Sequence, residues 1–504
     1  MTMHVLLNDA ADIRVVQHPG RVTTKLLDPV DQLLLILPER VPAAAWAALP
    51  QGAKLKAAMK KRDRTTPPAL VARLPNKRQT LVLGACLPAT ATVFEELQLG
   101  RRLASAAAAD QGATLGILVA GFDGESARRI GGNVLAAALA AGFSMPSFKA
   151  AAEPARVKTV RLFGLDERID TSRIEAEAHG NNLARWLTSL PANKLDARAY
   201  ADVVHALAKN AGWEFKRYGT GELEKLGAGA FLAVAQGNAD DSACIIRLRH
   251  RPGSKSAAAD LSLVGKGIIF DTGGNNLKPF QSMLDMHGDM QGSAVALGTL
   301  LAISRLELPL AVDCWLAITE NRIGPTAYKP RDVVSAANGK TIEAIHTDAE
   351  GRMALADTLV LASRERPRAI VDYATLTGSC INAITRRYSG VFTNRPDWHP
   401  RLKRTGQASG ERVWPFPMGA EFLEELKSDV ADIRQCTVQA LGDHILAASF
   451  LNEFVARDVP WIHIDLSAGD VEGGLGHVPT KATGFGVRYT LSLILDEQLL
   501  GAEA

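Results

Sequence analysis

Short apolar segments that are typical of β-strands alternate with alanine-rich helical segments along most of this chain. In the first third the predicted strands are 32–37, 80–83, 114–119 and 159–162, and the alternation returns after residue 194. Strands that alternate with helices favour an α/β fold. The chain has 504 residues, which is long enough for more than one domain. We therefore predict two α/β domains, a smaller N-terminal one and a larger C-terminal one with a mostly parallel central sheet.

A long helical pattern marks the expected connection between these domains. Residues 173–190 read as one helix, which Pro191 ends. We expect an N-terminal domain at 1–167, a connecting helix at 168–193 and a catalytic domain at 194–504. The N-terminal domain contains no cluster of His, Cys or carboxylate residues, so we expect it to have a role in assembly.

Charge gives little support to a nucleic-acid partner. The chain has 57 Lys and Arg residues against 54 Asp and Glu residues, a formal net charge of +3. Such a small excess does not predict binding to an acidic partner. Residues 54–64 form one basic run, which either contacts nucleic acid or, more commonly, forms the solvated face of a helix.

Hydropathy and cysteine usage predict a cytoplasmic protein without a membrane partner. No apolar run reaches the ~18 residues that a membrane-spanning helix needs, and the best short run is 33–37. The first 16 residues lack the basic start and apolar block of a signal peptide. The five cysteines are scattered and form no Cys-x-x-Cys pair, so we expect neither a disulfide framework nor a thiolate zinc site.

Acidic residues follow predicted strands in two segments of the C-terminal half. In the first segment, a strand at 261–264 ends at a Gly-Lys-Gly sequence, and Asp271 follows shortly after. A helix predicted from 282 to about 304 carries Asp285 and Asp289, one turn apart. In open α/β sheets, ligand crevices form just beyond the strand ends.

The second segment begins with a strand-like stretch at 341–346. Asp348 and Glu350 follow it, and a helix is predicted to about 366. Residues two apart in extended backbone face the same side, so we expect these two carboxylates to point together. Both segments therefore place acidic side chains beyond strand ends.

Four clustered carboxylates repel one another, and burying them is costly unless cations neutralise them. Oxygen-rich sites suit Mg²⁺, Mn²⁺ and Zn²⁺, and two such ions ~3.5–4 Å apart can promote hydrolysis. Taken singly, each residue has a common structural explanation: acids at loop starts are usually helix caps, and lysines are usually surface cations. Spacing alone leaves a metal site and these ordinary roles equally open.

Two motifs resemble the signatures of the leucyl aminopeptidase (cytosol aminopeptidase) family. The first is 264–274 (VGKGIIFDTGG) with the Leu-Lys-Pro of 277–279, and the second is 347–352 (TDAEGR). The resemblance covers about 182–488 and continues through three further segments, 373–378, 428–432 and 483–488. It implies a metal-dependent aminopeptidase that hydrolyses the N-terminal residue of peptides, preferring leucine and other neutral residues, through a metal-bridged hydroxide.

The resemblance also implies two divalent ions per subunit. These would be Mn²⁺ or Zn²⁺, with Mg²⁺ as a third candidate. Asp271 and Glu350 would bridge both ions. Asp348 would complete one site, and Lys266 and Asp289 would complete the other. Lys266 would bind as a neutral amine, because two adjacent dications depress its pKa.

Two further residues receive catalytic roles from the resemblance. Lys278 would polarise the scissile carbonyl and stabilise the oxyanion, and Arg352 would hold a bicarbonate ion that shuttles the proton of the nucleophile. The substrate pocket is expected to be lined by Met286, His346, Thr375, Leu376 and Gly378. The family is typically a homohexamer that takes small peptides.

The chain also departs from the family pattern. His346 stands where the family usually has Asn, and we expect it to form a pocket wall rather than to bind metal. Asn275 and Asn276 stand where the family more often has Ile and Ser. Two alternatives stay open: a weakly active scaffold that binds nucleic acid or regulates, and another dinuclear metallohydrolase such as a phosphoesterase.

Overall fold

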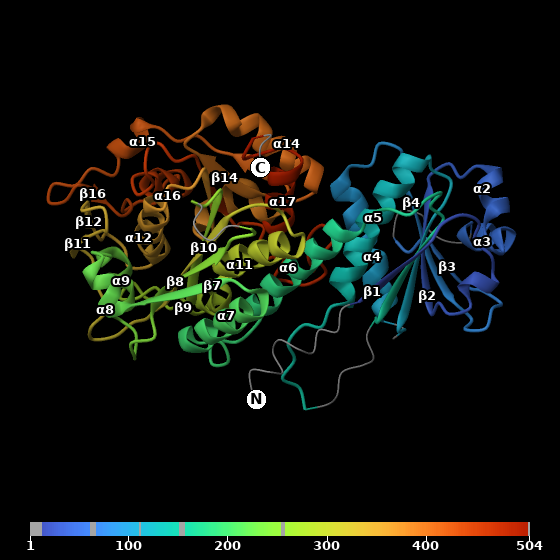
Figure 1. Cartoon of the computed structure of the whole chain (residues 1–504), viewed down its shortest axis with the longest axis horizontal. Helices are drawn as coiled ribbons and strands as arrows, with labels where there is room; N and C mark the ends of the chain where they lie inside the picture. Colours follow the sequence, from blue (N-terminus) through green and yellow to red (C-terminus); the bar gives the residue numbers. More distant parts are fainter. Residues whose placement is uncertain (1–12, 61–66, 110–111, 151–156, 254–257, 502–504) are drawn as a thin grey trace. The chain divides into compact units, whose positions relative to one another are not determined.

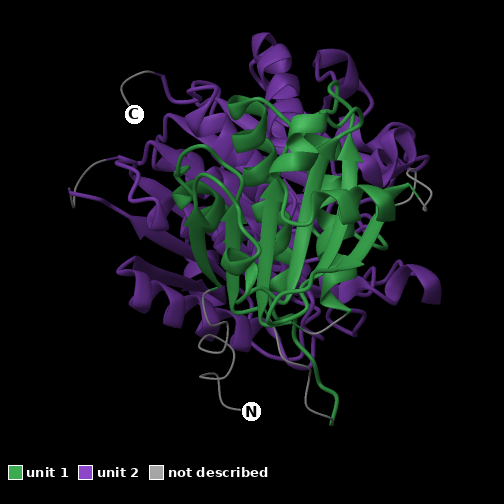
Figure 2. Ribbon diagram, turned by 90° about the vertical axis from the view of Figure 1, so that its right-hand side faces the viewer, with its two compact units in different colours: residues 1–178, 472–481 green, residues 179–471, 482–504 purple. Residues whose placement is uncertain are grey.

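A computed structural model describes the chain over residues 13–60, 67–109, 112–150, 157–253 and 258–501 (Figure 1). The chain divides into two compact units, residues 1–178 with 472–481 and residues 179–471 with 482–504 (Figure 2). Each unit combines a sheet with packed helices, which confirms the predicted α/β fold class. Among the described residues, no helix has both the length and the apolar character that crossing a bilayer requires.

The first unit contains a six-stranded sheet in the order β1-β6-β5-β2-β4-β3, in which only the β3–β4 pair is antiparallel. Its strands are β1 (Arg14–His18), β2 (Gln32–Pro38), β3 (Leu70–Arg73), β4 (Leu81–Leu87), β5 (Thr114–Val119) and β6 (Thr159–Phe163). Its helices are α2 (Ala43–Ala48), α3 (Gly52–Met59), α4 (Val93–Ala108) and α5 (Gly124–Gly142). The four strands predicted in this region are therefore present, and β4 extends further than expected.

The apolar sequence of β2 explains why helices cover both faces of this sheet. Successive side chains of a strand point to opposite faces. Leu34 and Ile36 accordingly join the buried cluster formed with α4 and α5, whereas Leu33, Leu35 and Leu37 join the cluster formed with α2 and α3. A continuous apolar strand of this kind is typical of a parallel sheet buried on both sides.

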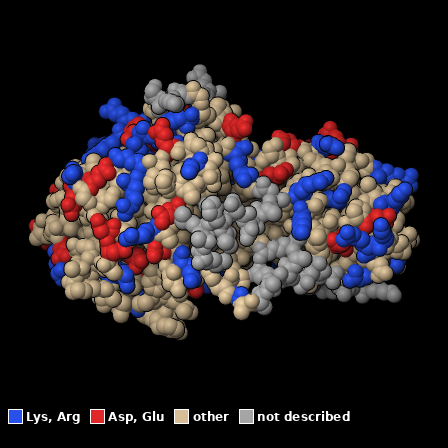
Figure 3. Space-filling model, turned by 60° about the horizontal axis from the view of Figure 1, so that its bottom comes forward, with Lys and Arg blue, Asp and Glu red and all other residues tan. Residues whose placement is uncertain are grey.

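The basic run at 54–64 falls partly on α3, and its residues 61–64 lie outside the described residues. Leu55 and Met59 of this helix are buried, while Lys54, Lys56 and Lys60 are exposed. This arrangement fits the solvated helix face that the sequence favoured over a nucleic-acid contact. On the face shown in Figure 3, Lys and Arg side chains are mixed with Asp and Glu side chains.

The second unit contains an eight-stranded sheet in the order β15-β14-β17-β13-β9-β10-β8-β7 and a three-stranded sheet in the order β11-β12-β16. The strands of the large sheet are β7 (Glu214–Gly219), β8 (Cys244–His250), β9 (Leu261–Asp271), β10 (Val312–Asn321), β13 (Ala369–Ala374), β14 (Ser389–Thr393), β15 (Val413–Pro415) and β17 (Trp461–Asp465). Those of the small sheet are β11 (Val333–Ser335), β12 (Thr341–Glu343) and β16 (Ile433–Arg434). The four central strands of the large sheet, β17, β13, β9 and β10, are all parallel.

Helices pack against the central strands of this sheet. α11 contacts β9 and α17, and α12 contacts β9, α9 and α16. The helices of this unit are α7 (Ala197–Ala211), α8 (Thr220–Lys225), α9 (Gly229–Ala235), α10 (Phe280–Met283), α11 (Gln291–Arg305), α12 (Glu350–Arg364), α13 (Gly378–Ile384), α14 (His399–Ser409), α15 (Ala420–Glu424), α16 (Asp443–Asn452) and α17 (Val487–Leu495). The helix predicted at 173–190 is α6 (Ser172–Thr188).

Two local predictions about the acidic segments were wrong. The strand expected at 261–264 continues as β9 to Asp271, so the Gly-Lys-Gly sequence lies inside the strand. Gly265 is needed there because a Cβ atom would lie 2.4 Å from the Cα atom of Ser293 in α11. The glycines therefore allow a helix to approach the strand closely.

The helix expected from 282 to about 304 is interrupted. α10 ends at Met283, a 3₁₀ turn spans Met286–Gly288, and α11 begins at Gln291. Thr375 explains part of this break, because its Oγ1 donates to the backbone oxygen of Asp289 at 3.1 Å. Asp289 thus sits at a bend that directs its side chain toward the sheet.

Candidate metal centre

The carboxyl ends of the central parallel strands carry the polar groups of the site. Asp271 ends β9, Asn321 ends β10, Asp465 ends β17, and Thr375 follows β13 directly. β10 and β13 lie on opposite sides of β9 in the sheet. The strand order therefore reverses direction at β9. Ligand crevices form at such topological switch points in open α/β sheets.

Three carboxylates meet at this switch point. Oxygen atoms of Asp271, Asp348 and Glu350 all lie within 4.8 Å of one another. The predicted convergence is therefore present, but its assumed extended backbone is not, because Glu350 is the first residue of α12. The turn into the helix, rather than strand periodicity, brings Asp348 and Glu350 together.

Two lysine side chains lie among these acids. Lys266 Nζ, from the middle of β9, lies 2.9 Å from Asp289 Oδ2 and 3.0 Å from Glu350 Oε1. Lys278 Nζ lies 2.8 Å from Asp271 Oδ2 and 2.5 Å from Asp348 Oδ1. The structure therefore brings all five predicted metal ligands and Lys278 into one connected cluster.

Burial and mutual repulsion make this cluster unfavourable for carboxylates without strong positive charge. Burial raises the pKa of Asp348 to about 7, with further contributions from Asp271 and Glu350. Burial also raises the pKa of Asp289 to about 7, although Lys266 opposes the rise. Oxygen-rich, buried and acidic sites of this kind fit divalent cations.

The same carboxylates also shift the pKa of Lys266. Burial lowers the pKa of Lys266, but Asp289, Glu350 and Asp271 outweigh it and hold the pKa above its ordinary value. Gly351 leaves room for this side chain, because a Cβ atom there would lie 2.6 Å from Lys266 Cε. The glycine of the second sequence motif is thus explained by the lysine of the first.

Asn275 and Asn276 have structural partners. Asn275 Nδ2 donates to the backbone oxygen of Tyr328 at 2.8 Å. Asn276 and Thr347 exchange two hydrogen bonds, from Asn276 N to Thr347 Oγ1 at 2.7 Å and from Thr347 N to Asn276 Oδ1 at 2.8 Å. Asn276 therefore fastens the loop after β9 to the loop that carries Asp348, whereas Asn275 fastens it to the segment after β10.

Asn321 was missed by the sequence interpretation. Its Nδ2 donates to Asp271 Oδ1 at 2.7 Å and to the backbone oxygen of Thr347 at 3.0 Å. This amide orients one candidate ligand and holds the other acidic loop against it. The apolar run that precedes it, residues 314–318, is the sequence signal that could have placed Asn321 at a strand end.

Gln435 holds the Asp348 loop from the opposite side. Its Oε1 accepts from the backbone N–H groups of Ile345 and His346 at 3.1 and 3.2 Å. Its Nε2 donates to the backbone oxygen of Ala349 at 3.0 Å. The Gln435 side chain is fully buried, whereas its three backbone partners lie on a half-buried loop.

Replacing Gln435 by Leu is expected to weaken metal binding about 10–100-fold, as loss of an outer-shell partner does. It also removes the partner of two half-buried N–H groups and one carbonyl, which lowers the free energy of unfolding by about 1 kcal/mol for each bond. Metal titration and urea unfolding measure the two effects. Gln407→Leu, at an exposed position of α14, is the control, and unchanged metal affinity in Gln435→Leu would contradict this role.

Arg352 is buried and paired within the chain. Its Nη2 donates to Asp443 Oδ2 at 2.6 Å, and its Nη1 donates to the backbone oxygen of Gln435 at 3.1 Å. Burial lowers the pKa of this guanidinium, but Asp443 outweighs burial and raises it. A bicarbonate ion at Arg352 does not fit these surroundings, because a carboxylate of the chain already occupies the guanidinium.

Some of the predicted pocket residues are accessible to solvent, whereas others are hydrogen-bonded to buried acidic groups. Met286 is half-buried, and His346 and Gly378 are exposed to solvent. Thr375 instead serves the acidic cluster, since its Oγ1 donates to Asp289 Oδ1 at 2.7 Å and its backbone oxygen accepts from Lys266 at 2.9 Å. Leu376 is held by its N–H, which donates to Asp465 Oδ1 at 3.3 Å.

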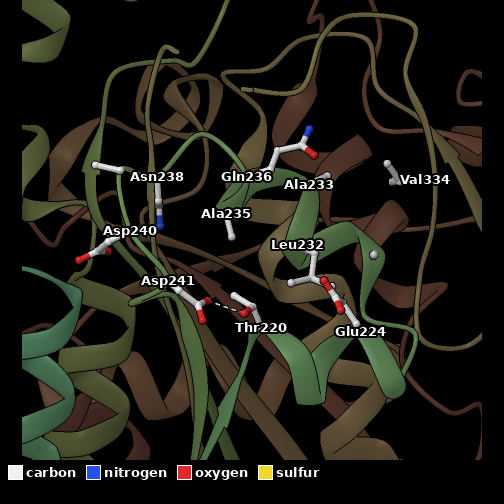
Figure 4. Close-up of a pocket in the computed structure, with 12 residues that line it drawn as sticks. Thr220, Glu224, Leu232, Ala233, Ala235, Gln236, Asn238, Asp240, Asp241 and Val334 are labelled. Carbon is white, nitrogen blue, oxygen red and sulfur yellow. Dashed lines mark hydrogen bonds between the residues drawn. The ribbon is translucent and has the colours of Figure 1, made fainter. Parts of the chain in front are cut away.

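A separate hollow of about 470 Å³ lies beside α8 and α9. Figure 4 shows Thr220 and Asp241 facing each other across a hydrogen bond at this hollow, with Asp240 and Glu224 nearby. Its lining includes no member of the acidic cluster. The hollow is therefore distinct from the candidate metal centre.

Known proteins share both sequence and fold with this chain. Residues 182–491 match the sequence model of a protein family that is described as "Cytosol aminopeptidase family, catalytic domain". A probable cytosol aminopeptidase of a Synechococcus species is 38% identical over 384 residues, covering 75% of this chain and 77% of that protein. Another, from Parasynechococcus marenigrum, is 36% identical over 437 residues, covering 85% and 89%.

Solved structures agree with this assignment. A mutant of tomato leucine aminopeptidase has a TM-score of 0.83 at 27% identity and covers 97% of each chain. The bottromycin maturation enzyme BotP in complex with Mn has a TM-score of 0.81 at 29% identity, covering 94% of this chain and all of that one. The family match spans more than half of the chain. The chain belongs to the cytosol aminopeptidase family and is a leucyl aminopeptidase-like, metal-dependent hydrolase.

Proposed function

We propose that the chain removes neutral N-terminal residues, leucine above all, from peptides at a centre of two divalent ions. The observation that carries this proposal is the approach of Asp271, Asp348 and Glu350 oxygens to within 4.8 Å of one another. Asp289 and Lys266 would complete the donor set; the two dications would lower the pKa of Lys266, which the carboxylates alone hold above its ordinary value, so that it binds as a neutral amine. When bound, the ions supply Lewis acidity and activate water.

The donor set suits Mn²⁺ or Zn²⁺, and also Mg²⁺. Carboxylate oxygens accept all three ions, whereas an amine nitrogen favours the more borderline Mn²⁺ and Zn²⁺ over Mg²⁺. The similar fold of a protein in complex with Mn supports manganese. The free α-amine of a peptide would be a further nitrogen ligand, which would restrict hydrolysis to the first residue.

Lys278 is the chain's candidate for charge stabilisation at the scissile carbonyl. Its side chain is 14% exposed, whereas that of Lys266 is 4% exposed. Asp271 and Glu350 raise the pKa of Lys278 despite the opposing effect of burial, so it remains an ammonium. An ammonium placed at the carbonyl oxygen favours the charge that develops there in the transition state.

Substrate positioning is assigned to the loop after β13 and to Met286. The backbone of Thr375, Leu376 and Gly378 would bind the extended peptide. Met286 is half-buried on the 3₁₀ turn next to Asp289, and its flexible apolar side chain would receive neutral side chains. His346, exposed on the Asp348 loop, would form the opposite wall.

The proposal also extends to assembly and location. Five free cysteine thiols suit a reducing compartment such as the cytoplasm. The family resemblance supports a homohexamer, in which the N-terminal domain, 1–167, would have a role in assembly. Light scattering of the purified chain measures this directly, and a monomer would contradict it.

Hydrolysis of leucine p-nitroanilide by metal-stripped and refilled protein tests the proposed activity. We expect turnover only after Mn²⁺ or Zn²⁺ is restored, and none with the N-acetylated substrate, because its blocked nitrogen cannot bind metal. Equal hydrolysis of the two substrates, or hydrolysis of a phosphate ester instead, would indicate another dinuclear hydrolase. No turnover of several aminoacyl substrates by folded, metal-loaded protein would exclude the proposed function.

A further inference from the structure

The Arg352–Asp443 pair joins two helices next to the acidic cluster. Arg352 lies in the first turn of α12, two residues after Glu350, and Asp443 is the first residue of α16. Gly442 precedes it in a left-handed conformation with a φ of 62°, which glycine adopts without strain. Carboxylates are favoured at helix N-termini, so the start of α16 stabilises the ionised side chain that faces Arg352.

This pair is shielded from solvent. The side chain of Arg352 is 2% exposed and that of Asp443 is 17% exposed. A buried guanidinium needs a counter-charge, because removing an ion from water without a partner is costly. Arg352, His346, Cys436 and His444 are among the groups that interact electrostatically with Asp443. Arg352 is the permanent cation of this set.

We propose that Asp443 is a built-in anion for Arg352, which makes the enzyme independent of any anion taken from solution. The carboxylate accepts from Arg352 Nη2 at 2.6 Å, so an exogenous bicarbonate or carboxylate would have to compete with it for the guanidinium. Asp443 is thus a positioning residue that acts through Arg352. The catalytic part of this inference rests on the proposed aminopeptidase activity, whereas its anion-binding part does not.

The unpaired atoms of the pair also argue against a second anion. Arg352 Nε and Asp443 Oδ1 are both buried and have no hydrogen-bond partner among the described residues. One is a donor and the other an acceptor. A neutral molecule such as water can satisfy both, whereas an anion would place a second negative charge against Asp443.

The test compares the wild type with Asp443→Ala and the isosteric Asp443→Asn, in carbonate-free buffer and with added sodium bicarbonate at matched ionic strength. We expect wild-type kcat to be unchanged by bicarbonate. In both variants kcat falls about tenfold or more, because Arg352 loses the counter-charge that holds it in place, and bicarbonate restores most of the kcat in Asp443→Ala. Glu222→Ala, which breaks an exposed pair with Lys216 in the first turn of α8, is the control and stays at wild-type activity.

A second readout does not depend on activity. Thermal unfolding of the metal-free proteins is expected to shift upward with bicarbonate in Asp443→Ala and to be unchanged in the wild type. Asp443→Asn keeps the size of the aspartate and leaves no space for the ion, so its unfolding temperature is expected not to rise with bicarbonate, and its loss of kcat tests the inference where the alanine variant does not fold. Stimulation or stabilisation of the wild type by bicarbonate would overturn the inference, as would folded variants that lose nothing. If no peptide is hydrolysed by the loaded wild type, the proposed function fails, and the unfolding shifts still decide the anion question.

Discussion

Glu350→Gln is expected to lower kcat/KM for leucine p-nitroanilide by about 10³-fold, because a charged element of the site is lost. Glu350 is 1% exposed, and its carboxylate lies 3.0 Å from Lys266 Nζ and close to Asp271 and Asp348. Glutamine has the same shape, but its NH₂ group cannot bind a metal ion. Elemental analysis should therefore find less than the wild-type metal content.

Two controls separate this loss from a general loss of structure. Burial and Asp271 raise the pKa of Glu350, so the neutral glutamine relieves repulsion, and the metal-free variant should unfold at the wild-type temperature or above. Glu365→Gln, at the other end of α12, changes a residue that pairs with Arg247 and Arg249. It should keep both metal and activity. Full metal content in Glu350→Gln would remove this residue from the donor set.

Lys278→Met is expected to lower kcat by about 10²–10³-fold, the effect of removing one oxyanion-stabilising group, while KM and metal content change little. The ammonium lies 2.8 Å from Asp271 and 2.5 Å from Asp348, and methionine retains its length without its charge. Steady-state kinetics with metal analysis measure this result. An increase in KM alone would indicate a binding role instead.

The matched control for this substitution is Lys329→Met. Lys329 is 64% exposed and pairs only loosely with Asp332, at 3.8 Å. Its replacement should leave kcat unchanged. Equal losses in the two variants would show that a general charge effect, rather than the place of Lys278 between two acids, explains the loss.

Much of the fold and of the acidic cluster could be predicted from the sequence, because both follow from local patterns. The strands of the first unit are short apolar runs that alternate with helical segments. Asp271, Asp348 and Glu350 lie within two compact motifs. The path of the backbone was harder to predict from the sequence. Asp289 sits at a bend because Thr375, which is 86 residues away, donates hydrogen bonds to its carbonyl and its carboxylate.

The residues that support the cluster could not have been predicted, because their partners are distant in sequence. Asn321 contacts Asp271 across 50 residues, and Gln435 contacts His346 across 89. Asp443 contacts Arg352 across 91 residues, and a carboxylate at a helix start reads as an ordinary capping residue. Only tertiary structure shows that it neutralises a buried arginine.

The most direct test of the dinuclear centre is a crystal structure of the Mn²⁺-loaded protein with anomalous scattering data collected at the manganese edge. We predict two peaks per chain, about 3.5–4 Å apart, both in contact with Asp271 and Glu350. Asp348 should lie against one peak, and Lys266 and Asp289 against the other. A single peak, or peaks away from these five side chains, would contradict the proposed metal centre.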